Sequence, residues 1–279
     1  MPGRLVLCAT PVGNLEDVTL RVLRCLRECD VVFAEDTRIS RLLLDRFDIK
    51  KPLRSFHERV ASGRLRELAA LLSAGKTAAV MTDAGTPGIA DPGTEFVRAA
   101  RAADAAVEVL PGASAVIGAL VLSGFDVSRF RFEGFPPRGD AARREHVAAA
   151  STDTGVTAWY EAPTRVRSLL ADIESCCPER AVFVLREYTK KFEQQLLGTA
   201  SDVLAALGAS PRGEFVVVLD GAGEARTKPE LGAGAAGALA MLLDEGVSVR
   251  LAVEAVRRAT GLPKKAVYAA ALDHRRSHS

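Results

Sequence analysis

The amino-acid sequence predicts an α/β protein with two α/β domains and a small C-terminal helical domain. Short apolar runs alternate with segments of helical periodicity, which is typical of mainly parallel sheets wrapped by helices. A stretch rich in Gly and Ala then separates this part from three short helical patterns. We therefore expect two α/β domains, a linker and a helical domain, at residues 1–124, 125–220, 221–237 and 238–279.

In the first domain, each expected strand is a short apolar run, and either turn residues or a helical pattern come after it. Thr19 is a suitable N-cap for a helix in which Leu20, Leu23 and Leu26 recur at helical spacing. Further helices are expected at 40–47, at 65–72 before Gly75, and from Thr94. The expected strands are Leu5–Ala9, Asp30–Ala34, Leu53–Phe56, Thr77–Met81 and Val107–Leu110.

The same alternation resumes after Asp126. Strand-like runs occur at Thr157–Tyr160, Ala181–Leu185 and Phe215–Leu219, with helical patterns at Val166–Ile173 and Val203–Leu207. Beyond the linker, helices are expected at Ala238–Asp244, Val249–Ala259 and Lys264–Leu272. The break at 261–263 gives the last two the pattern of a helix-turn-helix.

Composition limits the possible function classes. Of 279 residues, 48% are hydrophobic and the net charge is +2, so any contact with nucleic acid depends on local basic patches. The five cysteines form no C-x-x-C pair and predict buried reduced thiols with no metal site. Neither a signal peptide nor an apolar run of about 18 residues is present, which predicts a cytoplasmic protein with no membrane contact.

Four loops follow predicted strands, at Thr10–Leu15, Glu35–Arg38, Thr82–Gly93 and Pro111–Ala115. Three of them contain Gly and Pro, and two, Glu35–Arg38 and Thr82–Gly93, contain carboxylates. Ligands of open parallel sheets bind at the carboxyl ends of the strands, and Gly and Pro let the backbone turn close to a ligand. Neither a G-x-G-x-x-G nor a Walker motif is present, which argues against a dinucleotide or a nucleoside triphosphate. A cationic ligand suits the carboxylates, and S-adenosylmethionine, with its sulfonium and ammonium groups, fits.

The same loops carry a family resemblance. In order, the chain contains Thr10–Leu15, Ala34–Arg38, Asp83–Pro87, Leu110–Ala113, Glu133–Phe135 and Arg186–Lys190. This set resembles the bacterial small-subunit ribosomal RNA cytidine 2′-O-methyltransferases, a branch of the tetrapyrrole methylase superfamily. The resemblance implies the two-domain tetrapyrrole methylase fold, with S-adenosylmethionine in the cleft between the domains. It also implies a homodimer that acts on 16S ribosomal RNA within the small ribosomal subunit.

The resemblance also implies site residues. The cofactor should contact the turns after the first-domain strands, and two residues of the second domain should close the far side of its site. The expected cofactor residues are Pro11, Val12, Gly13, Asn14, Asp83, Ala84, Gly85, Thr86, Pro111, Gly112, Ala113, Tyr160 and Glu214. Where the family often has Ser and His, this chain has Ala162 and Thr164.

Methyl transfer to a ribose hydroxyl needs a group that accepts its proton. The candidates are Asp36, the first choice, followed by Glu35 and Glu187, and also Glu161; for each the alternative is an ion pair with a nearby Arg or Lys. Basic residues in loops beside the expected cleft are candidates for phosphate contact. These substrate residues are Arg38, Arg138, Lys190, Lys264 and Lys265, and Arg143 and Arg144 belong to the same group.

Two alternative functions stay open at this point. One is a methyltransferase that acts on a small tetrapyrrole or corrin precursor. Such enzymes usually have a Gly-rich first loop with an acidic residue, unlike Thr10–Leu15, and tend to lack the C-terminal helices. The other is a nucleic-acid binder that has lost its cofactor, against which the intact glycine loops argue.

Overall fold

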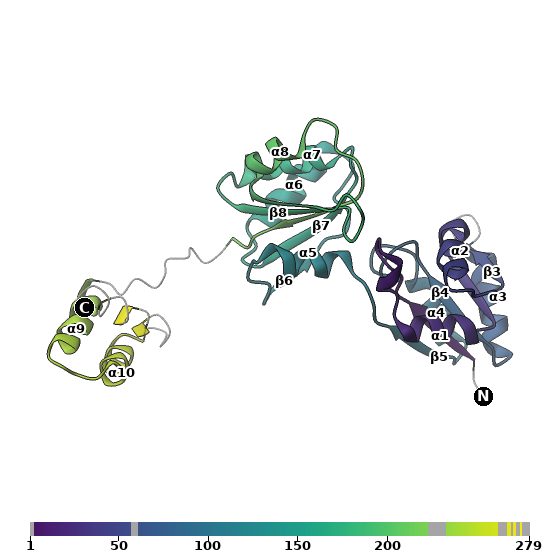
Figure 1. Ribbon diagram of the computed structural model, residues 1–279, viewed down its shortest axis with the longest axis horizontal. Helices are drawn as coiled ribbons and strands as arrows, with labels where there is room; N and C mark the ends of the chain where they lie inside the picture. Colours follow the sequence, from purple (N-terminus) through teal and green to yellow (C-terminus); the bar gives the residue numbers. More distant parts are fainter. Residues whose placement is uncertain are drawn as a thin grey trace. The chain divides into compact units, whose positions relative to one another are not determined.

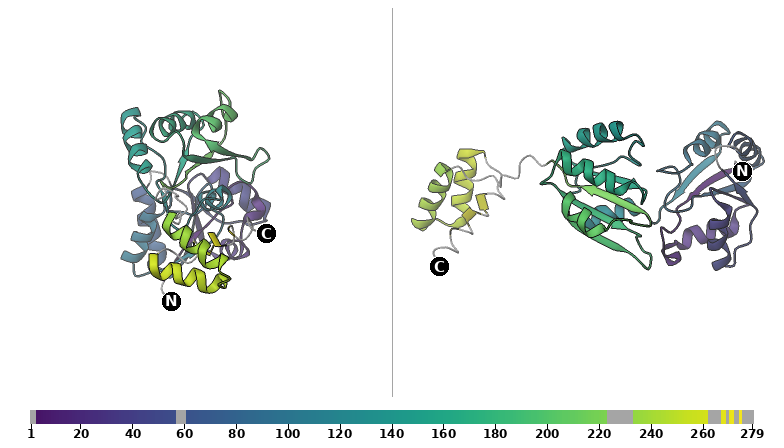
Figure 2. Two further views of the ribbon diagram at one scale, coloured as in Figure 1. Left: turned by 90° about the vertical axis from the view of Figure 1, so that its left-hand side faces the viewer. Right: turned by 90° about the horizontal axis from the view of Figure 1, so that it is seen from above.

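The computed structural model describes residues 3–56, 61–222, 233–261, 267, 268, 270, 271 and 274. The chain forms two compact units, Met1–Ala222 and Gly223–Ser279. The first unit contains two five-stranded sheets, and we call residues 3–114 the first lobe and residues 115–222 the second lobe. In both lobes helices cover the sheet on both faces (Figures 1 and 2), which confirms the predicted α/β fold class.

The sheet of the first lobe is entirely parallel, as predicted, with strand order β3-β2-β4-β1-β5. All five of its strands were expected from the sequence, with ends that differ by at most one residue. Their bounds are β1 Arg4–Cys8, β2 Val31–Ala34, β3 Leu53–Ser55, β4 Thr77–Met81 and β5 Ala106–Leu110.

Alternation along the strands divides the core of the first lobe into two layers. Val6 and Cys8 of β1 face helices α1 (Leu20–Glu28) and α2 (Thr37–Arg46), while Leu5 and Leu7 face α3 (Ala61–Ser73) and α4 (Thr94–Ala102). The Thr19 hydroxyl accepts a 3.2 Å hydrogen bond from the Val22 N–H, which confirms the predicted cap of α1.

The parallel arrangement brings the carboxyl ends of these strands to one edge. The loops after β1 and β4 are joined there by two backbone hydrogen bonds, from the Thr10 N–H to the Gly85 carbonyl (2.8 Å) and from the Gly85 N–H to the Thr10 carbonyl (3.1 Å). Gly85 has a φ of 79°, which favours glycine. Two of the four expected ligand loops are therefore joined at this edge.

The sheet of the second lobe is mixed, with order β6-β7-β10-β8-β9 and only the β6–β7 pair parallel. The expected strands and helices are present, and the edge strands β6 and β9 and helix α6 are additional. The elements are β6 Phe130–Phe132, α6 Asp140–Ser151, β7 Val156–Glu161, α7 Val166–Cys176, β8 Ala181–Arg186, β9 Gln194–Thr199, α8 Ala200–Leu207 and β10 Phe215–Leu219.

Helix α5 (Ala115–Ser123) connects the two lobes. It lies inside the segment expected as the first domain, 1–124, but its buried residues Val116, Ala119 and Leu120 pack on the second sheet. Helices α6, α7 and α8 cover the opposite face of that sheet. The change from one core to the other thus occurs at the start of α5, directly after the loop that follows β5.

The second unit contains two described helices, α9 (Ala233–Asp244) and α10 (Val249–Thr260). Helix α9 begins inside the segment expected as a linker, and α10 ends at Gly261 with a φ of 71°. A small core contains Leu239, Val253 and Val256. Most of the third expected helix, Lys264–Leu272, lies outside the described residues, as do Lys264 and Lys265.

The cysteines are unpaired and only partly follow the prediction. Cys8, Cys25 and Cys29 are buried, whereas Cys177 is half-buried and Cys176 is exposed. Across the described ranges, no group of three or more His, Cys, Asp or Glu side chains is placed to bind a metal. None of the described helices has the length and apolar character needed to cross a membrane.

Candidate active site

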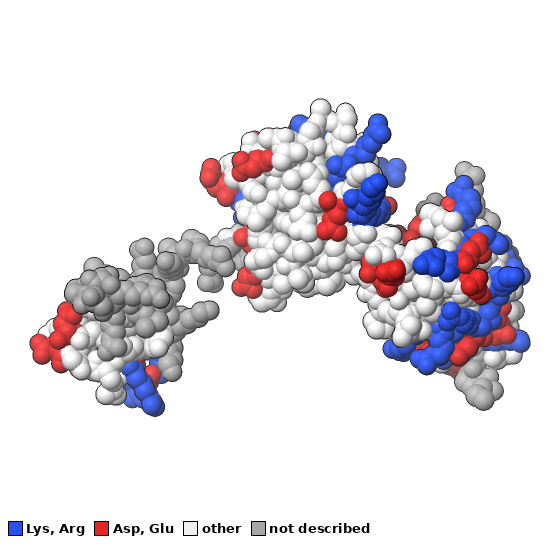
Figure 3. All heavy atoms as spheres, viewed as in Figure 1, with Lys and Arg blue, Asp and Glu red and all other residues white. Residues whose placement is uncertain are grey.

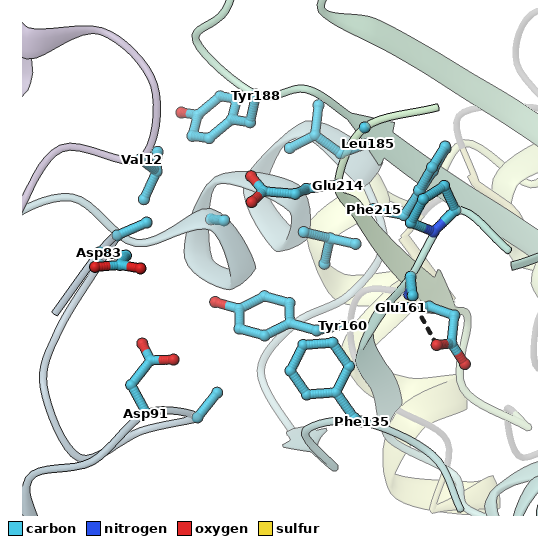
Figure 4. A pocket seen from close by; sticks show the side chains of 18 of the residues that line it. Val12, Asp83, Asp91, Phe135, Tyr160, Glu161, Leu185, Tyr188, Glu214 and Phe215 are labelled. Carbon is cyan, nitrogen blue, oxygen red and sulfur yellow. Dashed lines mark hydrogen bonds between the residues drawn. The ribbon is translucent and has the colours of Figure 1, made fainter. Parts of the chain in front are cut away.

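A cavity of about 400 Å³ lies at the carboxyl edge of the first sheet, within the first unit (Figure 4). The first lobe contributes loop residues that follow β1, β2 and β4, and the second lobe contributes residues near the ends of β7, β8 and β10. The lining residues are Val12, Glu35, Asp83, Ala84, Gly85, Ala90 and Asp91 from the first lobe, and Ala115, Phe135, Tyr160, Glu161, Ala162, Pro163, Leu185, Tyr188, Gly213, Glu214, Phe215 and Val216 from the second.

The first-lobe side of the cavity is acidic. Glu35 follows β2 directly, and Asp83 and Asp91 lie on the long loop after β4. Burial raises the pKa of all three carboxyl groups. Repulsion from nearby carboxylates adds to it, from Asp91 and Asp83 on Glu35 and from Asp83 on Asp91. The carboxylates of Asp83, Asp91 and Glu214 point toward the same space in Figure 4. A cationic ligand in this space would relieve the repulsion.

The loops that carry these carboxylates are fixed by hydrogen bonds. The Thr10 hydroxyl donates to the Thr82 carbonyl at 3.1 Å. The backbone N–H of Asp36 donates to Oδ1 of Asp83 at 3.1 Å. Asp83 therefore joins the loop after β2 to the loop after β4 while it lines the cavity.

The second-lobe side of the cavity is aromatic. Tyr160 lies near the end of β7, and burial raises the pKa of its phenol. Its ring makes edge-to-face contacts with Phe132 and Phe135, at centroid distances of 4.8 and 5.8 Å. Tyr188, on the loop after β8, completes this aromatic wall (Figure 4).

Glu161 is held by an ion pair behind this wall. Its side chain is fully buried and accepts hydrogen bonds from the Ala162 N–H (2.8 Å) and from Nη2 of Arg165 (2.9 Å). The same Arg165 nitrogen also donates to the Pro136 carbonyl at 2.7 Å. Glu161, a candidate base in the sequence, is therefore neutralised by Arg165 and braces the loop that carries Phe135.

The structure brings together about half of the expected cofactor residues. Val12, Asp83, Ala84, Gly85, Tyr160 and Glu214 line the cavity, whereas Pro11, Gly13, Asn14, Thr86, Pro111, Gly112 and Ala113 do not.

Gly13 and Asn14 pack instead against the second lobe. A Cβ on Gly13 would lie 2.6 Å from the Tyr188 carbonyl oxygen, and the Asn14 N–H donates to the Thr189 hydroxyl at 2.9 Å. Gly112 has a similar role within the first lobe, because its Cβ would lie 2.8 Å from that of Ala9. These glycines allow close approach of protein segments.

Glu161 apart, the candidate bases were Asp36, Glu35 and Glu187, and of these three only Glu35 lines the cavity. The Asp36 carboxylate caps α2 by accepting from the Arg38 N–H at 2.8 Å and forms an ion pair with the Arg38 guanidinium. Hydrogen bonds from Arg38 lower the pKa of Asp36 to about 2. A carboxylate of such low basicity, engaged outside the cavity, is poorly suited to accept a proton.

Glu187 is engaged in a similar way. It accepts hydrogen bonds from Nζ of Lys190 and from the Glu214 N–H, both at 3.0 Å. Partial burial raises its pKa, but these two donors outweigh burial and leave the pKa below its ordinary value. Lys190 also forms a 2.7 Å ion pair with Glu214, so this expected substrate residue is neutralised by two carboxylates.

The other expected substrate residues divide into paired and free cations. Arg38 is paired with Asp36, and Arg143 is buried in ion pairs with Asp140 and Asp172. Arg138 is exposed, and no residue in the described ranges forms an ion pair with it. Figure 3 shows Lys and Arg side chains gathered at one end of the second lobe, whereas both charges alternate over the first.

Sequence reasoning did not assign Asp91, Phe135 or Tyr188 to the site. Asp91 belongs to the loop already singled out after β4, so its position there was the available signal. Phe135 and Tyr188 belong to two of the motifs that carry the resemblance, Glu133–Phe135 and Arg186–Lys190, and this was the available signal.

Comparison with known proteins identifies the family. The family model for tetrapyrrole (corrin/porphyrin) methylases matches residues 4–204. The chain belongs to this family. Its members are methylases that use S-adenosylmethionine, and the acidic cavity fits the sulfonium and ammonium groups of that cofactor.

Individual relatives that are about 40% identical to the chain carry a more specific name than the family does. The chain is 42% identical over 220 residues to "Ribosomal RNA small subunit methyltransferase I" of Thermotoga maritima, covering 78% of this chain and 99% of that one. It is 39% identical over 268 residues to the protein of the same name from Micromonospora olivasterospora, covering 95% and 85%.

Solved structures confirm the methylase fold. The methyltransferase CobJ superposes with a TM-score of 0.59 at 17% identity, covering 79% of this chain and 94% of that one. Uroporphyrin-III-C-methyltransferase from Thermus thermophilus superposes with a TM-score of 0.55 at 22% identity, covering 78% and 94%. These identities show the shared fold alone.

Proposed function

We propose that this methylase transfers a methyl group from S-adenosylmethionine to the 2′-hydroxyl of a cytidine in 16S ribosomal RNA. The main support is the acidic cavity at the strand ends, formed by Glu35, Asp83 and Asp91 against an aromatic second wall. The relatives' shared name, at about 40% identity over most of the chain, supports a substrate in the small ribosomal subunit.

In this proposal the cofactor lies between the loop after β4 and the second lobe. Asp83 and Glu214 would attract its cationic groups, and Val12, Ala84, Gly85 and Tyr160 would hold it as the walls of the cavity. When bound, S-adenosylmethionine supplies an electrophilic methyl group. The protein's main contribution is to hold the attacking oxygen in line with it, about 3–3.5 Å away.

We propose Glu35 as the group that accepts the proton of the ribose hydroxyl. It lines the cavity, and burial raises its pKa, which makes it more basic than an ordinary carboxylate. Asp91, which shares these properties, is the second candidate. Asp36 and Glu187 are less suited because Arg38 and Lys190 engage their carboxylates.

The predicted homodimer and cytoplasmic location belong to this proposal. Val109 on the edge strand β5 is 52% exposed, and Ile117 and Val121 on α5 are 49% and 71% exposed. Ile117 and Val121 are four residues apart and share one face of α5, and exposed apolar side chains of this kind support burial by a second copy of the chain. Light scattering of the full chain tests the dimer, and a single monomeric species would exclude it.

The decisive experiment is methyl transfer to unmethylated small ribosomal subunits. With labelled cofactor, the label should enter 16S ribosomal RNA, and mass mapping should place the methyl group on a cytidine ribose. A corrin precursor serves as the alternative acceptor. Label in the corrin but not in the RNA would refute the ribosomal substrate, and failure to bind the cofactor would favour a binding protein without activity.

A further inference from the structure

Phe135 is an unusual residue of the cavity because it is both a wall residue and largely exposed. Its side chain is 58% exposed, and it lies on the loop between β6 and α6. One edge of the ring contacts Tyr160, as Figure 4 shows. The apolar surface of this ring is in contact with water, which is unfavourable unless a ligand covers it.

The loop that carries Phe135 is rigidly held. The Tyr160 N–H donates to the Gly134 carbonyl at 2.8 Å, and Arg165 donates to the Pro136 carbonyl at 2.7 Å. Arg165 is itself fixed by the fully buried carboxylate of Glu161. Gly134, with a φ of 63°, allows the turn between these two anchors. Phe135 is thus exposed but preorganised, which reduces the entropy lost when a ligand binds.

The charges around the cavity restrict how an RNA can enter it. Glu35, Asp83 and Asp91 disfavour a phosphate inside, so the backbone of a polyanionic substrate must stay at the rim. Arg138 is three residues beyond Phe135, is exposed and has no carboxylate partner in the described part of the chain. It is suited to a phosphate, while Phe135 offers a flat surface for a base.

We propose that Phe135 is the stacking platform for an unpaired base of the RNA substrate, with Arg138 at the adjoining phosphate. This inference rests on the proposed function and identifies the part of the chain that receives the nucleotide. A nucleotide whose ribose reaches the cavity must leave its helical stack, so its base loses its stacking partners. Proteins offset this loss by providing aromatic side chains on which such a base stacks. The partner is therefore single-stranded RNA at the target position.

Kinetics with unmethylated small ribosomal subunits test the proposal. Phe135→Ala should lower kcat/KM by about 5- to 150-fold, the range for loss of one base stack. Phe135→Trp should retain activity within a few-fold because the ring is restored. The matched control is Phe130→Ala, which removes another exposed phenylalanine of the second lobe that does not line the cavity. Calorimetric affinity for S-adenosylmethionine should be the same in all variants.

Three results would overturn the proposal. Unchanged kcat/KM in Phe135→Ala excludes a contact with substrate. A parallel loss of cofactor affinity assigns Phe135 to the cofactor instead. Equal losses in Phe135→Trp and Phe135→Ala mean that ring stacking is not the cause.

A direct binding measurement separates this inference from the proposed function. In Phe135→Trp, emission of the new indole should be quenched when single-stranded RNA spanning the target region is added, whereas Phe130→Trp should show no quenching. Absence of quenching overturns the platform. Quenching in a protein that methylates no ribosomal RNA leaves the platform intact and overturns the proposed reaction.

Discussion

The structure indicates a different role for Arg143 from the one that the sequence predicts. In the sequence it is one of four arginines that are candidates for phosphate contact. In the structure its side chain is 6% exposed, and its Nε lies 2.6 Å from the carboxylate of Asp172, which is 10% exposed. Its second partner, Asp140, is 74% exposed and contributes little. We therefore predict that Arg143 stabilises the fold and does not contact RNA.

The size of the effect follows from burial. Removing one partner of a buried ion pair costs about 3–5 kcal/mol when the other charge stays buried without compensation, and the exposed Arg144 compensates Asp172 only in part. For a unit of this size, each kcal/mol lowers Tm by roughly 2–4 °C, so Arg143→Ala should lower Tm by about 6–20 °C. The neighbouring Arg144 is 68% exposed and lies 3.5 Å from the same Asp172. Arg144→Ala is the matched control and should change stability by less than about 0.5 kcal/mol.

Thermal unfolding followed by calorimetry measures the stability of both variants, and RNA affinity is measured well below the transition. The expected result is a large loss of stability in Arg143→Ala with RNA affinity unchanged. A further variant, Arg143→Met with Asp172→Leu, should regain much of the stability because no unpaired charge remains. A stable Arg143→Ala protein with weakened RNA binding would refute the reasoning.

Three further predictions concern the site and the second unit. Asp83→Ala should weaken binding of S-adenosylmethionine about ten- to a hundredfold through loss of a charged contact; unchanged calorimetric affinity in a folded variant would contradict it. Glu35→Gln should lower single-turnover rates by about 10²- to 10⁴-fold, whereas Asp36→Asn, which keeps the cap of α2, should have a small effect; the reverse order would make Asp36 the base. A chain that ends at Ala222 should bind the cofactor normally. The slope of its log affinity for ribosomal RNA against log salt concentration should be shallower by about two units. An unchanged slope would mean that the C-terminal helices make no RNA contacts.

The first lobe could be predicted in detail because its strands are short apolar runs with clear ends. A parallel sheet brings all its carboxyl ends to one edge, so the ligand loops followed from the strand positions alone. Helix α5 was not predicted, because its sequence has no clear local pattern. Its sequence, Ala115–Ser123, is apolar on all sides and shows no helical period. The edge strand β9 (Gln194–Thr199) is half polar and gave only a weak signal.

Within the site, sequence could locate the loops but not the direction of each side chain. Glu35 and Asp36 are adjacent carboxylates at the end of β2, and only the start of α2 separates their roles. Asp36 becomes the cap and binds Arg38, while Glu35 faces the cavity. Gly13 shows the same limit, because a glycine needed for a neighbouring protein segment looks identical in sequence to one needed for a ligand.

The contacts around Tyr188 explain how the two walls of the cavity keep their relative position. Gly118 of α5 lies directly against this ring, since a Cβ there would be 2.7 Å from it. On the other side, Gly13 packs against the Tyr188 carbonyl, and Asn14 donates to Thr189. The turn after β8 is thus fixed by both the helix that joins the lobes and the first ligand loop. Because methyl transfer depends on close alignment of the reacting atoms, we expect the small residues at these contacts to affect the reaction although they do not line the cavity.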